Sequence, residues 1–181
     1  YYLEDLVKDK LPKTAGDELK TFATPGEFEP LSFVIYADES LGSVDVYISD
    51  LCSGDNIIKS DSIELRLVKW LDKRREFRSH VSNLIPTPHF LETYKSFTLD
   101  EGEFKQVWLT IHVPEETPAG VYTGEVIVKP ENKESQAIKL TFEVLPFQLR
   151  ESKKLHSVYY GHYRLRSKEE RARDFQDMRD H

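Results

Sequence analysis

The stretch QVWLTIHVPEETPAGVYTGEVIV, residues 106–128, decides the fold, because it joins two alternating strands through a turn rich in Pro, Thr and Gly. Its first half alternates apolar residues with Trp, Thr and His, which is the period-two pattern of a half-buried strand. Pro114 ends that strand, Pro118 fixes its own φ, and Gly120 avoids the Cβ restriction just before the return strand starts at Val121. The stretch predicts a β scaffold, and it contains no arrangement that would activate a nucleophile or hold a metal.

Length and charge bound the class of protein. The chain has 181 residues, enough for one well-buried domain of about 150 residues and a remnant. Its net charge of -7, from 25 Lys and Arg against 32 Asp and Glu, disfavours nonspecific binding to nucleic acid or to an anionic membrane surface. No apolar run approaches the roughly 20 residues of a transmembrane helix, and the start YYLEDLVKDK lacks the features of a signal peptide. We therefore expect no nucleic-acid partner and no membrane insertion, and the single cysteine, Cys52, excludes an internal disulfide.

Alternating runs recur along the chain before Pro146. They predict strands at residues 18–24, 31–36, 44–49, 63–67 and 138–144. We expect the first to be an edge strand and the second, which is apolar on both faces, to be central. A loop is expected at 50–61, and the polar region between Trp70 and Pro88 is expected to be the least regular part. Six or seven strands at this spacing predict a mainly β fold, an antiparallel immunoglobulin-like β-sandwich.

The pattern changes in the last part of the chain. Residues 156–163, HSVYYGHY, predict a short aromatic strand, and Ser167 with Glu170 forms a capping box that opens a charged helix. The apolar stripe of this helix is narrow and consists of Ala172, Phe175 and Met178. A strand followed by a helix predicts one βα unit of a (β/α)8 barrel whose remainder is absent. The predicted organisation is an approach segment at 1–17, the sandwich at 18–149, and a linker with the βα unit at 150–181.

Six segments carry a resemblance to a known family: PGEFEPLSFVIYA, VDVYISDL, VWLTIHVPEETPAGVYTGEVIV, IKLTFEVLPFQL, YYGHYRL and FQDMRDH. The most specific element is VP-x-x-x-PAG-x-Y-x-G at residues 113–124. Over residues 18–181 the chain resembles the N-terminal β-sandwich and the domain junction of glycoside hydrolase family 123 and related bacterial glycosidase-like proteins.

The resemblance implies a non-catalytic sandwich in front of a TIM barrel that hydrolyses N-acetylgalactosaminides. The acid and the oxazoline-stabilising carboxylate of such enzymes lie on later barrel strands, so we assign no catalytic residue and expect this chain to be inactive alone. The expected partners are the missing C-terminal barrel and, through the parent protein, a glycan that contains N-acetylhexosamine. No cofactor and no metal is expected, and the resemblance implies a periplasmic or secreted location.

Exposed aromatic residues support an alternative function, an independent carbohydrate-binding module, because sugars bind flat rings through their apolar C–H faces. Trp108, Trp70 and Tyr94 are the candidates for such a platform. Packing is the simpler explanation for these rings: Trp108 would fill an inter-sheet or interdomain contact, and Trp70 would hold the polar region against the core.

The end of the predicted aromatic strand offers candidate substrate-binding residues. Active sites of (β/α)8 barrels form at the C-terminal ends of their strands, and His162, Tyr163 and Arg164 fall at that position. Tyr163 would stack on a sugar and Arg164 would bond a hydroxyl or a carboxylate. A packing role for the ring and an exposed role for the guanidinium are the alternatives.

Two further patterns are compatible with metal binding and also with a simpler structural role. His156 and His162 would begin a metal site on one strand face, but no third ligand has suitable spacing. An oxygen-rich loop would coordinate Ca²⁺ through Asp50, Asp55, Asn56 and Asp61. The spacing of these residues is not that of an EF-hand. Junction histidines and solvated turn carboxylates are the simpler interpretations.

Charged clusters give two more hypotheses. Neighbouring carboxylates would act as acid and base if they converged across a sugar, in the pairs Asp38 with Glu39 and Glu101 with Glu103. A basic cluster would recognise an acidic polysaccharide through Lys73, Arg74, Arg75 and Arg78. In both cases a solvated polar loop is the simpler interpretation.

Overall fold

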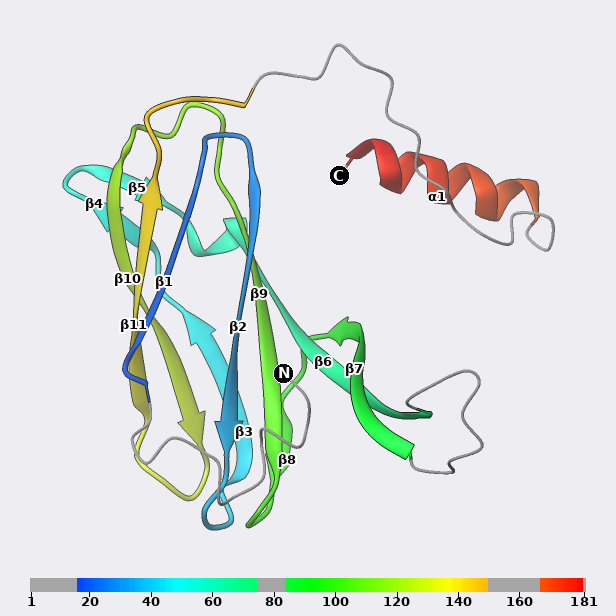
Figure 1. The fold of residues 1–181 in the computed structure, drawn as a ribbon. Helices are drawn as coiled ribbons and strands as arrows, with labels where there is room; N and C mark the ends of the chain where they lie inside the picture. Colours follow the sequence, from blue (N-terminus) through cyan, green and yellow to red (C-terminus); the bar gives the residue numbers. More distant parts are fainter. Residues whose placement is uncertain (1–15, 75–83, 150–166, 181) are drawn as a thin grey trace. The chain divides into compact units, whose positions relative to one another are not determined.

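The computed structural model describes residues 16–74, 84–149 and 167–180 (Figure 1). It divides into two compact units, Tyr1–Leu149 and Arg150–His181. The described part of the first unit consists of two β-sheets joined by turns, which confirms the predicted mainly β sandwich. No helix in the described residues is long and apolar enough to cross a bilayer.

The first sheet has seven strands within the described residues. Five lie in the order β1-β11-β10-β3-β8, and a hairpin of β4 and β5 joins β10 through β4. The bounds are β1 (Glu18–Ala23), β3 (Gly42–Ile48), β4 (Leu51–Ser53), β5 (Asn56–Ile58), β8 (Phe97–Leu99), β10 (Gly120–Pro130) and β11 (Gln136–Val144). The pairs in this sheet are antiparallel except β1 with β11, which run parallel, so the predicted antiparallel arrangement has one exception.

The second sheet has four antiparallel strands in the order β2-β9-β6-β7. The bounds are β2 (Phe28–Tyr36), β6 (Ile63–Arg74), β7 (Leu84–Thr93) and β9 (Phe104–His112). The two strands of the opening stretch are β9 and β10, and they belong to different sheets. The turn between them therefore carries the chain across the sandwich.

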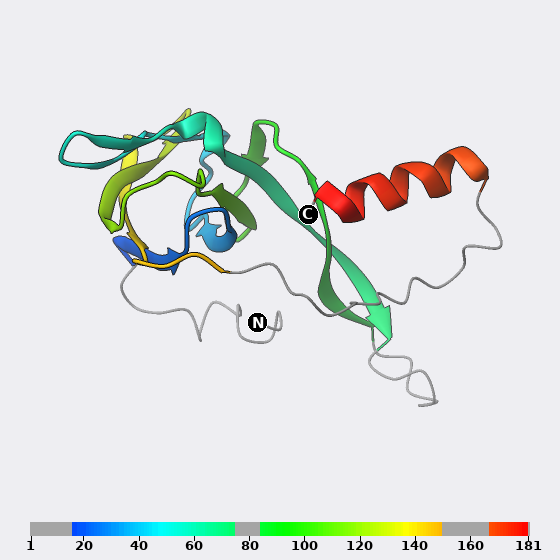
Figure 2. The same cartoon turned by 90° about the horizontal axis from the view of Figure 1, so that it is seen from above.

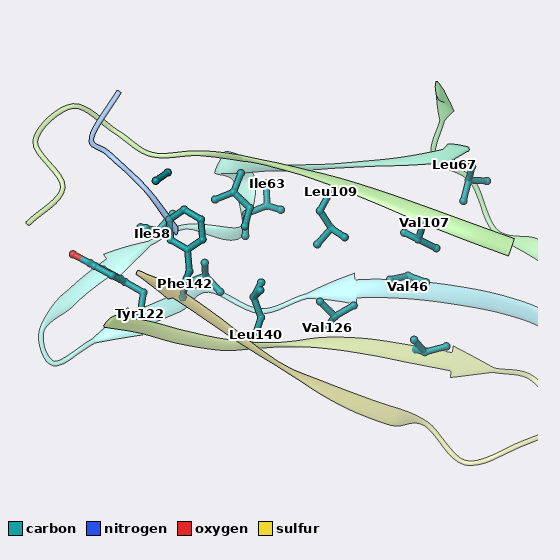
Figure 3. Close-up of a cluster of buried hydrophobic side chains, with 14 of the residues drawn as sticks. Val46, Ile58, Ile63, Leu67, Val107, Leu109, Tyr122, Val126, Leu140 and Phe142 are labelled. Carbon is teal, nitrogen blue, oxygen red and sulfur yellow. The ribbon is translucent and has the colours of Figure 1, made fainter. Parts of the chain in front are cut away.

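The core lies between the two sheets (Figure 3). Val107, Leu109 and Ile111 of β9 have no exposed surface, as the alternation of the opening stretch requires. The same cluster includes apolar side chains of the first sheet such as Val46, Val126, Leu140 and Phe142. Full burial stabilises each such side chain by roughly 1.5–3 kcal/mol relative to exposure, so the alternating pattern decides which face of each strand points inward.

Three strand predictions need correction. The strand at 31–36 is β2, which lies at the edge of its sheet and pairs with β9, because apolar residues on both faces of a strand do not determine how many strands lie beside it. Residues 50–61 are not a loop: they hold β4, β5 and a 3-10 turn at Ser60–Ser62, because Leu51 and Ile58 are buried. In the polar region that starts at Trp70, residues 70–74 and 84–88 are not irregular: they belong to the paired strands β6 and β7, whose charged side chains conceal the alternation. Residues 75–83 lie outside the described residues.

The hairpin of β6 and β7 extends beyond the four-stranded part of the sheet (Figures 1 and 2). β6 pairs with β9 over residues 63–67 and with β7 over residues 66–74, so from residue 68 onward β7 is its partner in the described residues. We call the two-stranded part, residues 68–74 with 84–91, the arm. A register shift between Lys69 and Trp70 marks a β-bulge in it, which increases the local twist of the hairpin.

The second unit contains α1 (Lys168–Asp180) in its described part. The predicted capping box is confirmed: the Ser167 N–H donates to Glu170 Oε2 at 2.8 Å, and the Glu170 N–H donates to Ser167 Oγ at 3.1 Å. Phe175 of the predicted apolar stripe is 58% exposed within the structure. The predicted strand at 156–163 lies outside the described residues, so the βα unit stays a prediction.

Candidate functional site

The outer face of the second sheet gathers aromatic side chains. Trp108 of β9 lies between Ser32 of β2 and Arg66 of β6, and its Nε1 donates to Thr110 Oγ1 at 3.3 Å. Side chains two residues apart on a strand point to the same face, so the neighbouring pairs extend this surface. We call it the aromatic face, and it consists of Val34, Tyr36, Val68, Trp70, Phe104 and Trp108.

Trp70 connects the aromatic face to the arm. Its ring meets Phe104 edge to face, with ring centres 5.5 Å apart and planes at 85°, an arrangement that stabilises aromatic pairs. The Nε1 atom of Trp70 is buried and has no hydrogen-bond partner in the described part of the chain. A buried donor without an acceptor costs about 1–3 kcal/mol, so this atom is the least satisfied polar group of the face.

The polar side chains around the aromatic face bond to one another. Gln106 Nε2 donates to Ser32 Oγ at 3.1 Å, and the Arg66 guanidinium forms an ion pair with Glu64 at 2.7 Å. Together with the Trp108–Thr110 bond, these contacts occupy donors that would otherwise point outward. Of the aromatic face, Val34 is 37% exposed, Val68 is buried, and the four rings are partly buried.

Tyr94, the third predicted aromatic of a sugar platform, lies elsewhere. It packs against the core, and its hydroxyl oxygen accepts the backbone N–H of Val46 in the first sheet at 2.6 Å. Burial raises the pKa of the Tyr94 phenol above its ordinary value. The structure therefore brings Trp70 and Trp108 to one face and gives Tyr94 a contact between the sheets.

A second surface lies where the chain leaves the sandwich. The ends of β1, β9 and β11 and the starts of β2 and β10 meet there (Figure 1). Five exposed large apolar side chains lie around this end, and we call them the exit-end patch: Phe22 and Val121 on the outer face of the first sheet, Phe28 on the outer face of the second sheet, and Phe147 and Leu149 after β11. They are between 47% and 63% exposed. The alternation within single strands did not predict this patch, although the apolar residues Phe147 and Leu149, which closely follow Pro146, were a signal for it.

Backbone hydrogen bonds join the segments that carry the exit-end patch. The Gly26 N–H donates to the Val113 carbonyl at 2.8 Å, and the Leu145 N–H donates to the Ala23 carbonyl at 2.9 Å. The ring of Phe28 stacks on an imidazole at the end of β9, with ring centres 4.4 Å apart. The patch is therefore presented by backbone that is bonded across several strands.

The outer face of the first sheet carries a cluster of ion pairs beside exposed apolar side chains such as Phe22 and Tyr47. Glu18 bonds to Lys20 at 2.7 Å, to Lys139 at 3.0 Å and to the Thr141 hydroxyl at 2.9 Å. These partners, Lys20 first, lower the pKa of Glu18 from 4.5 to about 2. Exposed ion pairs of this kind contribute little to stability, and they keep this part of the surface hydrated.

The predicted carboxylate pairs lie in two neighbouring exposed turns, Asp38 with Glu39 and Glu101 with Glu103. The Ala37 N–H donates to the Glu103 carbonyl at 2.9 Å, which joins the two turns. Glu39 forms an ion pair with Lys133, and the Glu103 carboxylate accepts a backbone N–H of its own turn at 2.9 Å. The structure thus places the two carboxylate pairs in neighbouring exposed turns, and the bonds of Glu39 and Glu103 help to hold these turns.

The predicted calcium loop forms the β4–β5 hairpin. Asp50 Oδ2 pairs with Lys59 Nζ at 2.9 Å, and its Oδ1 accepts the Ser60 N–H at 2.8 Å. These bonds, that of Lys59 first, hold the pKa of Asp50 below its ordinary value. The other predicted oxygen ligands are exposed, and within the described ranges no three His, Cys, Asp or Glu side chains converge on a metal position.

Several predicted residues lie outside the described residues. These are His156, His162, Tyr163 and Arg164 of the predicted strand, and Arg75 and Arg78 of the basic cluster. Lys73 and Arg74 of the same cluster end β6.

Comparison with known proteins gives a family and a similar solved structure. Residues 7–130 match the Glycoside hydrolase 123 N-terminal domain, whereas no curated protein matches the chain. A family 123 glycoside hydrolase from Clostridium perfringens, analysed for glycolipid glycan hydrolysis, is similar with a TM-score of 0.72 and 21% identity. The match covers 81% of this chain and 25% of that chain, so this chain spans about a quarter of the relative's length.

Two other solved structures are more distant. A PapD-like domain of human CEP192 has a TM-score of 0.38 and 13% identity, and the match covers 74% of this chain and 84% of that chain. The N-terminal domain of PorA has a TM-score of 0.32 and 14% identity, and the match covers 72% of this chain and 90% of that chain. Neither adds to the fold assignment. The Clostridium perfringens structure supports the sandwich fold.

Proposed function

Because the chain belongs to the glycoside hydrolase 123 N-terminal domain family, we propose that it is a non-catalytic β-sandwich that supports the catalytic barrel of a glycoside hydrolase. The barrel would act on glycans that contain N-acetylhexosamine. The study of glycolipid glycan hydrolysis in the Clostridium perfringens relative agrees with a glycan as the substrate. In that barrel, His162, Tyr163 and Arg164 stay our candidates for lining the sugar site.

The exit-end patch is the observation that carries the supporting role. Five large apolar side chains, each around half exposed, surround one end of a small domain, and exposed apolar groups of this kind favour an interaction at that end. The polypeptide continues from this same end, so a catalytic domain that follows is tethered next to the patch. Burial of the patch would stabilise both domains, because apolar area removed from water contributes about 25 cal/mol per Å².

Exit-end variants of the full polypeptide test this role. In the double variant Phe22→Ser/Val121→Ser, we expect the half-life of aryl N-acetylgalactosaminide hydrolysis at a raised temperature to fall roughly fivefold, because lost interdomain burial speeds irreversible unfolding. The rate at ambient temperature should stay close to that of the parent. Tyr47→Ser is the matched control, since Tyr47 is 52% exposed on the same sheet but lies away from the exit end.

Two results would contradict the proposal. One is a half-life of the double variant that equals that of the Tyr47 control. The other is turnover of the aryl N-acetylgalactosaminide by the 181-residue chain by itself, since a supporting domain has no chemistry of its own.

An independent carbohydrate-binding module is the second candidate, because Trp70 and Trp108 share one face. This function predicts that the 181-residue chain is retarded on glycan affinity gels and that its Trp fluorescence is quenched by the glycan. A Trp108→Ala variant would lose both effects. Absence of retardation would remove this candidate.

A further inference from the structure

We infer that β1 is a strand that detaches locally from the first sheet, and that its docking on β11 controls the exit-end patch. The inference rests on the proposed function, because it describes how the surface offered to the catalytic barrel is assembled. In the docked state, β1 places Phe22 in the patch and ties the segment that follows β11. In the detached state, β1 does neither.

β1 itself contributes little to the core. Its inward-facing residues, Leu19, Thr21 and Ala23, pair with buried residues of β11. Of these three, Ala23 is buried and Leu19 is only partly buried against the core. In β11, by contrast, Leu140 and Phe142 have no exposed surface. Since stabilisation follows the apolar area removed from water, β1 is held by much less burial than its neighbour.

The other ties of β1 are backbone bonds on one side and polar side-chain contacts near water. Within the described residues β1 pairs with β11 alone, and the pairing is parallel, which is slightly less stable per residue than antiparallel pairing. Glu18 pairs with Lys139 at 3.0 Å and accepts the Thr141 hydroxyl at 2.9 Å. The Thr21 hydroxyl donates to Glu29 of β2 at 2.6 Å. Exposed ion pairs stabilise weakly and are screened by salt, so β1 is the strand that we expect to open first.

The turn after β1 is held independently of β1. It has the residues and the bond of a type II turn: the Glu27 N–H donates to the Thr24 carbonyl at 3.2 Å, Pro25 is second, and Gly26 is third with φ of 88°. The Gly26 N–H donates to the Val113 carbonyl at 2.8 Å, and the Val113 N–H donates to the Glu27 carbonyl at 2.9 Å. These bonds fix the turn to the segment after β9, so the turn serves as the hinge when β1 leaves β11.

β1 carries one residue of the exit-end patch and holds the segment that carries two others. Phe22 is 61% exposed on β1. The Leu145 N–H donates to the Ala23 carbonyl at 2.9 Å, and Phe147 and Leu149 follow shortly after it. Release of β1 therefore removes Phe22 from the patch and frees Leu145. A barrel that buries Phe22 binds the docked form better, so barrel contact and β1 docking stabilise each other.

Amide hydrogen exchange of the 181-residue chain tests the detachment. The N–H groups of Lys139 and Leu145 donate to carbonyls just before β1 and at its end, whereas the Val113 N–H donates to the hinge turn. We expect the Lys139 and Leu145 amides to exchange roughly thirtyfold faster than the Val113 amide, after correction for intrinsic rates. Urea below the unfolding transition should barely change the two fast rates, because opening of one strand exposes little surface.

A variant and a second protein sharpen the test. Glu18→Gln weakens the tie to Lys139, so exchange of the Lys139 amide should become roughly threefold faster still. Glu39→Gln is the matched control, because its carboxylate pairs with Lys133 between two turns, and the variant should leave this amide unchanged. In the full polypeptide, the Lys139 and Leu145 amides should exchange roughly tenfold more slowly than in the 181-residue chain, since burial of Phe22 holds β1 in place.

The outcomes separate this inference from the proposed function. Exchange of Lys139 and Leu145 at the rate and urea dependence of Val113 would overturn the inference and leave the supporting role intact. Fast exchange at the same rate in both proteins would overturn the control of the patch. An unchanged half-life of Phe22→Ser/Val121→Ser, together with fast exchange that urea does not alter, would overturn the proposed function while supporting the detachment of β1.

Discussion

The Tyr122 hydroxyl donates a hydrogen bond of 2.9 Å to the carbonyl oxygen of Pro118. Tyr122 has no exposed surface, and burial raises the pKa of its phenol. The bond closes the turn through which the chain passes from β9 in one sheet to β10 in the other. The Pro and Tyr of the VP-x-x-x-PAG-x-Y-x-G element thus hold together the crossing that defines the sandwich.

Removal of this bond should destabilise the sandwich. Tyr122→Phe keeps the ring but leaves the Pro118 carbonyl without its donor, so we expect the free energy of unfolding to fall by about 1 kcal/mol. Urea unfolding of the 181-residue chain measures the change. Tyr47→Phe is the control: its ring is 52% exposed, and its effect should stay within about 0.5 kcal/mol. Equal stability of the two variants would show that the bond contributes nothing.

A side chain at position 124 should not fit. A Cβ added to Gly124 of β10 would lie 2.6 Å from Leu51 Cδ2 and 2.7 Å from the Asp50 carbonyl oxygen, at the start of β4. We expect Gly124→Ala to lower the free energy of unfolding by about 1–3 kcal/mol, the usual cost of overpacking. Gly16→Ala is the control, because a Cβ there meets nothing within 4 Å. Unchanged urea midpoints for both variants would contradict the prediction.

Glu18 should titrate far below an ordinary glutamate. Its pKa is lowered from 4.5 to about 2 by Lys20 first, then by Lys139 and the Thr141 hydroxyl. Since the folded-state pKa lies below the unfolded value, its stabilising contribution is complete above pH 4.5 and is lost as the pH falls toward 2. The group is exposed, so added salt should weaken the effect.

An NMR titration of the Glu18 carboxyl carbon measures this shift. The midpoint should lie well below 4.5 in the parent and should return toward that value in Lys20→Ala/Lys139→Ala. A Lys133→Ala variant, whose ammonium pairs with Glu39 instead, should leave the midpoint unchanged. The same midpoint in the parent and the double variant would contradict the assigned cause.

The capping box should stabilise the start of α1. Ser167→Ala removes the acceptor of the Glu170 N–H, so the helix should lose about 1 kcal/mol. Amide hydrogen exchange at residues 168–171 should become roughly fivefold faster, following the energy lost at the cap. Arg173→Ala, an exposed substitution inside the helix, should leave these amides unchanged. No change in exchange for Ser167→Ala would mean that the cap contributes nothing.

Prediction from the sequence succeeded where the signal was local. The alternation at 106–112 predicted β9 and its buried face, and Ser167 with Glu170 predicted the start of α1. It failed at 50–61 and at the arm, because short or charged strands form when distant segments supply their partners. For the candidate site, Trp70 and Trp108 were named, but their shared face and the exit-end patch were not.

The sequence by itself determined the strands whose side chains alternate, the turn at Pro118 and the helix cap, because each depends on residues a few positions apart. Only the tertiary structure decided that β9 and β10 belong to different sheets, that β1 runs parallel to β11, and that β2 lies at an edge. It also decided that Trp70 meets Phe104 rather than the core. Strand partners are selected by packing between distant segments, and that selection leaves no periodic mark along the chain.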